Sequence, residues 1–156
     1  MKTDIGLLVL RLGFASLLIG FHGWARLGRA IGYVAYGQPW TFVNVVERLG
    51  FPIPSVFAVL SASTESIGAL LVAAGLFTRW ASASIAINMA VALFNESVSG
   101  DPLELPALYL LGALAITLLG PGRWSLDGLR TRRRRDRRPS VSDDQQRRHP
   151  TGSRRS

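Results

Sequence analysis

The side chains that could do chemistry are few, and most of them lie inside long apolar runs. Glu65 stands near the middle of one run, and Arg11 and Asn88 stand inside two others. An ionisable side chain inside a membrane-length apolar segment is costly, so it needs a partner or a function. An ion pair of Glu65 with Arg11, or a hydrogen bond to Asn88, would be structural. A site for protons or for the polar head of a quinone-like molecule is the functional alternative. The sequence leaves both open.

His22 extends this group, because it follows Arg11 by eleven residues, close to three helical turns, and so shares its helix face. It lies near the outer end of its apolar run, at the depth expected for Glu96, Glu104 and Tyr109. A histidine with two carboxylates could relay protons or bind a metal. No tight ligand spacing supports a metal, so we expect none and interpret His22 as a hydrogen-bonded residue at a helix end. The predicted polar pocket consists of Glu65, Arg11, His22 and Asn88, with Glu96, Glu104 and Tyr109 as secondary candidates.

Four apolar segments must position these residues, at about 5–25, 55–76, 79–96 and 104–120. A helix needs about 20 residues to cross a hydrocarbon core of about 30 Å, and the four segments are near that length. None of them has the charged outward face of a helix in a soluble bundle. We therefore expect an all-α fold, a transmembrane four-helix bundle formed by residues 1–128.

The first loop of this bundle, residues 26–54, contains a second pattern. Phe42, Val45, Val46 and Leu49 follow the i, i+3, i+4, i+7 spacing of one helix face. The pattern predicts a short amphipathic helix that lies on the outer face of the bundle or caps it.

Charge divides the chain into two parts. Residues 1–128 hold seven basic and seven acidic side chains, whereas residues 129–156 hold eleven arginines and three aspartates and account for the net charge of +8. The second part has almost no apolar side chains, so we predict a disordered tail. The absence of cysteine excludes disulfides and thiolate metal sites, and no glycine-rich nucleotide-binding motif is present.

The arginine-rich tail also predicts topology. An even number of spans places both termini on one side, and arginines directly after a span belong in the cytoplasm. Next to the membrane they would contact anionic lipid, and we do not expect nucleic acid, because no aromatic side chain interleaves them. The predicted lipid contacts are Arg132, Arg133, Arg134, Arg135, Arg137 and Arg138.

Five stretches, taken in their order along the chain, form a characteristic pattern: "RLGFASLLIGFHGWARL", "LGFPIP", "TESIGALLVAAGLFTRWAS", "NMAVALF" and "ELPALYLLGALAITLLGPGRWSLD". In this order, over residues 5–127, the chain resembles the DoxX family of small bacterial membrane proteins. The resemblance implies a four-span protein of the bacterial inner (plasma) membrane. It also implies a loose association with redox chemistry, since related proteins include a quinone-reducing thiosulfate oxidoreductase subunit. Quinone as cofactor and a soluble or membrane redox protein as partner are implied in the same way.

Three functions remain open from the sequence. The chain could be a membrane subunit or accessory protein of a quinone-linked oxidoreductase, or a non-enzymatic scaffold that holds a soluble partner through its tail. A small proton-coupled transporter is the third alternative, suggested only by the intramembrane Glu65. Whether the chain is itself an enzyme stays open.

Overall fold

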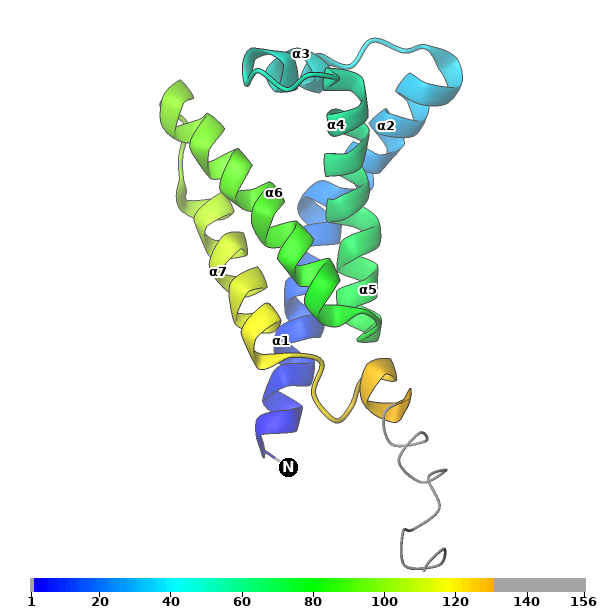
Figure 1. Cartoon of the computed structure of the whole chain (residues 1–156), viewed down its shortest axis with the longest axis vertical. Helices are drawn as coiled ribbons and strands as arrows, with labels where there is room; N and C mark the ends of the chain where they lie inside the picture. The colour runs from blue at the N-terminus through cyan, green and yellow to red at the C-terminus, as the bar shows by residue number, and fades with distance from the viewer. Residues whose placement is uncertain (1, 131–156) are drawn as a thin grey trace, which may run out of the picture.

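The computed structural model describes residues 2–130, and all regular structure in that range is helical (Figure 1). The elements are α1 (Lys2–Leu18), η1 (Ile19–Gly23), α2 (Trp24–Tyr36), α3 (Thr41–Arg48), α4 (Pro54–Ser63), η2 (Thr64–Gly68), α5 (Ala69–Ala74), α6 (Thr78–Ser99) and α7 (Glu104–Leu119). Here η1 and η2 are single π-helical turns. The arginines predicted to contact lipid, between residues 132 and 138, lie outside the described range.

Three continuous helices are long and apolar enough to cross a membrane. They are Asp4–Tyr36 with 33 residues, Pro54–Ala74 with 21 and Thr78–Ser99 with 22. The fourth apolar helix, α7, is shorter, with 16 residues. Pro54–Ala74, Thr78–Ser99 and Glu104–Leu119 lie at three of the predicted segments, within three residues at each end.

The boundary predicted for the first segment was wrong. The helix does not end near residue 25 but continues through η1 and α2 to Tyr36, where Gly37 ends it at a left-handed φ of 64°. Arg26 and Arg29 follow the apolar run and suggest that it ends, yet residues 24–36 contain no proline, and the first glycine with a left-handed backbone is Gly37. Trp24 and Arg26 therefore lie inside a helix rather than at its end.

The larger apolar core joins α1, α5, α6 and α7. Its buried members include Phe14, Leu18, Val72, Ile85 and Ile116. α6 and α7 form an antiparallel hairpin, and α1 lies beside α5 and α7 (Figure 1). Packing between α1 and α7 depends on a small residue, because a Cβ on Gly112 would lie 2.9 Å from the Phe14 ring.

A smaller core lies at the opposite end of the molecule, where α3 crosses the start of α4 (Figure 1). It contains Trp40 and Val46 together with three alanines of α2 and α4. The residues predicted to form a short helix do form α3, which is followed by Gly50 at a φ of 81°. This second core holds α3 over the space between α4 and α6.

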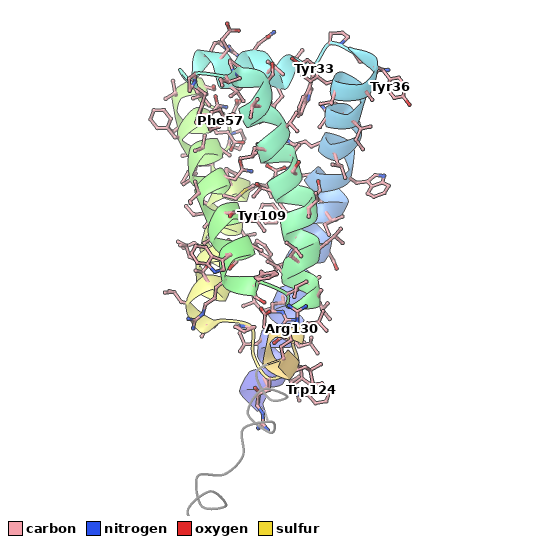
Figure 2. The ribbon with its side chains drawn as sticks, turned by 45° about the vertical axis from the view of Figure 1, so that its right-hand side comes forward. Tyr33, Tyr36, Phe57, Tyr109, Trp124 and Arg130 are labelled. Carbon is pink, nitrogen blue, oxygen red and sulfur yellow. The ribbon has the colours of Figure 1, made fainter. Side chains whose placement is uncertain are left out.

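The segment after α7 closes the other end of the bundle. Asp127 accepts hydrogen bonds from the backbone N–H groups of Phe77 and Thr78, each at 3.1 Å, at the start of α6. Its own N–H donates to Gly75 O at 3.0 Å. Trp124 and Arg130 lie at this end, Tyr33, Tyr36 and Phe57 lie toward the α3 end, and Tyr109 lies between them (Figure 2).

Candidate functional site

The two π-helical turns lie against each other in the middle of the molecule. Ser66 Oγ in η2 donates to Gly23 O in η1 at 2.8 Å. A Cβ on Gly23 would come within 3.2 Å of Glu65 O, so the close approach requires a residue as small as glycine. π turns inside α-helices frequently accompany functional sites. Here they place Glu65, the residue before Ser66, against the first long helix.

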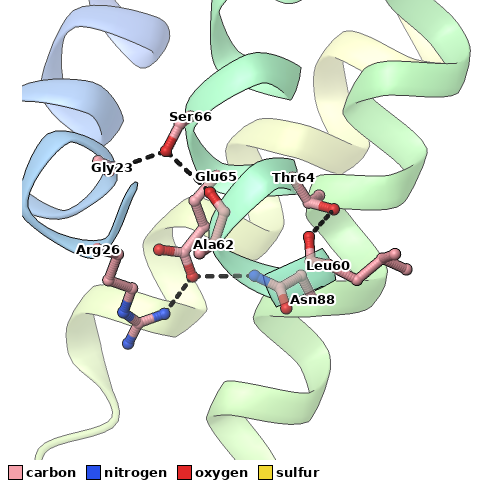
Figure 3. A network of polar contacts seen from close by, with 8 residues as sticks. All are labelled: Gly23, Arg26, Leu60, Ala62, Thr64, Glu65, Ser66 and Asn88. Atoms are coloured by element: carbon pink, nitrogen blue, oxygen red, sulfur yellow. Dashed lines mark hydrogen bonds and ion pairs between the residues drawn. The ribbon is translucent and has the colours of Figure 1, made fainter. Parts of the chain in front are cut away.

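Glu65 is completely buried, and its carboxylate is the centre of a polar network (Figure 3). Arg26 Nη1 forms an ion pair with Oε1, and Asn88 Nδ2 donates to the same oxygen at 2.9 Å. The Arg26 guanidinium also lies over the Phe42 ring, 4.7 Å from its centroid. One carboxylate oxygen thus joins α2, η2 and α6, and Arg26 connects this network to α3.

Three polar atoms in this region are buried without a hydrogen-bond partner among the described residues: Glu65 Oε2, Glu96 Oε2 and His22 Nδ1. Buried polar atoms in folded proteins nearly always have a partner in the protein or in bound water. Glu65 and Glu96 line the same cavity. Each of these oxygens can accept a hydrogen bond from water or from a ligand in the cavity.

That cavity has a volume of about 330 Å³ and lies between α3, α4 and α6. Its polar wall contains Arg26, Glu65 and Asn88, and Glu96 lies two turns further along α6. The remaining walls are mainly apolar, with side chains that include Phe42, Val45, Val46, Leu49, Phe51, Phe57, Leu60, Ile87 and Val91. A mostly apolar cavity with a few converging polar groups is typical of a small-molecule site. The arrangement suits an amphipathic ligand with a flat polar head.

The structure brings some of the predicted site residues together. Glu65 and Asn88 are hydrogen-bonded, and Glu96 lines their cavity. His22 contacts Tyr109 edge to face, with ring centroids 5.8 Å apart, and lines a separate cavity of about 290 Å³. His22 and Tyr109 therefore border the Glu65 network without lining its cavity.

Of the two structural pairings considered for Glu65, the hydrogen bond from Asn88 is present, whereas the ion pair with Arg11 was wrong. Arg11 is buried, donates to Val72 O and Ala73 O at 3.0 Å each, and also donates to Pro121 O. Val72 is seven residues beyond Glu65, about 10 Å along a helix. The contact of Ser66 with Gly23 holds Glu65 next to the first long helix at a different level, and Arg11 donates instead to carbonyls at the end of α5, of which Val72 O also accepts from Gly75 N at 3.1 Å.

Glu104 also lies apart from the site. It is exposed at the start of α7 and does not line the Glu65 cavity. Arg26, in contrast, was not among the predicted site residues and is the ion-pair partner of Glu65. The signal that could have found it is its spacing of four residues from His22, which places both on one face of a helix that continues past residue 25.

The polar side chains of the site carry charge and hydrogen-bonding groups. Within residues 2–130, no group of three or more His, Cys, Asp or Glu side chains is placed to hold a metal ion. The residues can bind and orient a polar head group, and the paired Glu65 and Arg26 can accept and donate hydrogen bonds to it.

Comparison with known proteins gives one match. The DoxX family model matches residues 6–95, which is more than half of the chain and includes Arg26, Glu65 and Asn88. No curated protein and no solved structure matches the chain.

Proposed function

This chain belongs to the DoxX family of membrane proteins, and on that premise we propose that it is a membrane accessory subunit of a quinone-linked oxidoreductase. The observation that carries the proposal is the apolar cavity beside the buried Glu65–Arg26–Asn88 network. A quinone has a flat ring with polar atoms on its edge and an apolar tail, which is the shape and polarity that such a cavity accepts.

The polar groups suit both redox states of this ligand. Quinone carbonyls accept hydrogen bonds, and the N–H groups of Arg26 and Asn88 can donate them. Quinol hydroxyls donate, and the unpartnered oxygens of Glu65 and Glu96 can accept. The volume of about 330 Å³ is near the lower end of ligand cavities, which span roughly 300–1,000 Å³. We therefore expect the ring to be enclosed and the tail to leave the cavity toward lipid.

In this proposal the chain binds and orients the ligand, and a soluble or membrane redox protein transfers the electrons. The chain has no cysteine, so thiol redox chemistry has no residue to use. The identity of the partner determines whether the subunit itself takes part in the reaction.

The proposed setting is the inner membrane of a bacterium, with α7 as a fourth span, both termini in the cytoplasm and α3 at the outer face. The positive-inside bias supports it, because eleven arginines follow residue 128 whereas Glu96, Asp101 and Glu104 lie at the other ends of α6 and α7. Residues 1–128 would form the membrane domain, and residues 129–156 a cytoplasmic tail whose arginines attract anionic lipid.

A binding experiment tests the ligand. The full chain in lipid nanodiscs is titrated with a decyl-chain benzoquinone and with its reduced form, and binding is followed by calorimetry. We expect both forms to bind, and Glu65→Gln to weaken binding about tenfold, as the loss of a charged hydrogen bond does. Glu104→Gln is the matched control, because Glu104 is an exposed carboxylate outside the cavity.

A second variant distinguishes a loss of binding from misfolding of Glu65→Gln. Val91→Trp places a large side chain into the cavity wall and leaves the polar network intact, so it should abolish binding in a folded protein. No binding to the unmodified chain at millimolar ligand would overturn the proposal. Recovery of a soluble partner that depends on residues 129–156 would then favour the scaffold.

A further inference from the structure

Arg29 lies on the first long helix, next to exposed apolar side chains. It is exposed, and the nearby Phe21 and Trp24 are 73% and 75% exposed. Within residues 2–130 its guanidinium makes one hydrogen bond, from Nε to Ala25 O at 3.3 Å, and no ion pair. An arginine at a lipid-facing position is costly unless an anion or water reaches it. No carboxylate within residues 2–130 pairs with Arg29, so its guanidinium is available to water or to an anion from outside these residues.

A cavity lies beside Arg29, between the first long helix and α3. It has a volume of about 290 Å³ and is lined by His22, Arg26 and Arg29 on one side and by Trp40, Thr41 and Phe42 on the other. None of its lining residues is acidic. His22 Nδ1 is buried there without a hydrogen-bond partner among the described residues. The cavity therefore has two guanidinium groups and one ring nitrogen near it and no carboxylate in its own lining, although Arg26 pairs with Glu65 outside it.

The three polar side chains lie on one face of the helix, because their spacings are four and three residues. Arg26 is paired with Glu65, which lines the cavity of about 330 Å³. Arg29 forms no ion pair with residues 2–130. Guanidinium groups match phosphate oxygens with two parallel hydrogen bonds. A phosphate that contacts Arg29 and Arg26 would supply an anion and offer an acceptor oxygen to the Nδ1–H tautomer of His22.

We propose that this cavity binds the phosphate group of a phospholipid, held by Arg29 and Arg26 with His22 beside them. A lipid suits the site better than a free anion, because Phe21 and Trp24 lie exposed next to it and can contact acyl chains. The site is separate from the proposed quinone cavity, although Arg26 borders both. The proposal does not depend on quinone binding.

Native mass spectrometry of the full chain, delipidated in mild detergent, tests the site. The protein is titrated with phosphatidylglycerol, with diacylglycerol of the same acyl chains, and with inorganic phosphate. We expect phosphatidylglycerol to occupy one site in preference to diacylglycerol, and Arg29→Gln to weaken this binding about tenfold. Arg48→Gln is the matched control, because Arg48 is an exposed arginine on α3 that does not line the cavity.

The arginines after residue 130 also attract anionic lipid. The unmodified chain and both variants share these arginines, so the comparison of Arg29→Gln with Arg48→Gln removes their contribution. Equal binding of phosphatidylglycerol by these two variants would overturn the proposal, as would equal binding of diacylglycerol and phosphatidylglycerol to the unmodified chain. Saturation by inorganic phosphate without preference for the lipid would assign the cavity to a free anion and overturn the lipid assignment.

Discussion

Arg26 Nη1 pairs with Glu65 Oε1 across 39 residues of sequence, between α2 and the π turn η2. The Glu65 side chain is 1% exposed and that of Arg26 is 28% exposed, so the carboxylate depends on this partner for its neutralisation. Arg26 also borders the cavity of the proposed quinone site and the cavity of the proposed phosphate site. Loss of the pair should therefore affect both the stability of the bundle and ligand binding in the two cavities.

Arg26→Gln should destabilise the protein by roughly 3 kcal/mol, because it leaves a buried carboxylate without its counter-ion. Unfolding by sodium dodecyl sulfate in mixed micelles measures the loss. The double variant Arg26→Gln with Glu65→Gln removes both charges, so it should be more stable than the sum of the single losses predicts, with a coupling of about 2 kcal/mol. Additive losses would show that the ion pair contributes nothing specific.

Arg11→Lys should lower the free energy of unfolding by roughly 3 kcal/mol, although it keeps the charge. The guanidinium donates to the carbonyls of Val72, Ala73 and Pro121 from three different nitrogens, a geometry that a compact ammonium group cannot reproduce. Thermal unfolding in detergent measures the change. Arg123→Lys is the control, because Arg123 is exposed at the same end, and we expect a change within about 0.5 kcal/mol. If both lysine variants behave alike, the carbonyl contacts carry no stability.

These two arginines show how far the sequence could predict the site. Hydropathy places the helices, and the similar depth of Glu65 and Asn88 in their helices indicates that they meet, as they do. The partner of Glu65 depends on helix register, which hydropathy does not encode. Gly23 approaches Glu65 and Ser66 closely, and the π turn η1, which contains His22, interrupts the 3.6-residue count that placed Arg11 and His22 on one face. Arg11 consequently contacts α5, whereas His22 contacts Tyr109 of α7.

Asp127→Asn should destabilise the protein by roughly 1–2 kcal/mol, the usual cost of losing a charged cap at a helix start. The carboxylate accepts from the N–H groups of Phe77 and Thr78, and Phe77 has a left-handed φ of 48° that is unfavourable for a residue with a side chain. Limited proteolysis should cut near residue 77 faster in this variant. Asp101→Asn, an exposed aspartate beyond the other end of α6, should leave stability and cleavage unchanged. Equal cleavage in both variants would contradict the capping role.

Gly75→Ala and Gly100→Ala form a matched pair that separates backbone strain from crowding. Both glycines end helices with left-handed backbones, at φ values of 69° and 78°, so alanine costs each about 1–2 kcal/mol of strain. A Cβ on Gly100 would meet nothing within 4 Å, whereas one on Gly75 would lie 2.5 Å from Ser125 Cβ and 2.6 Å from Arg11 Nη2.

The Gly75 variant must therefore displace both the closing segment after α7 and the buried guanidinium. We expect it to lose roughly 2 kcal/mol more than Gly100→Ala, the cost of forcing a group into a packed interior. Thermal unfolding of the two variants in the same detergent measures the difference. Equal losses would mean that Arg11 and residues 120–127 can move away from α5 without cost, and that they do not fix this end of the bundle.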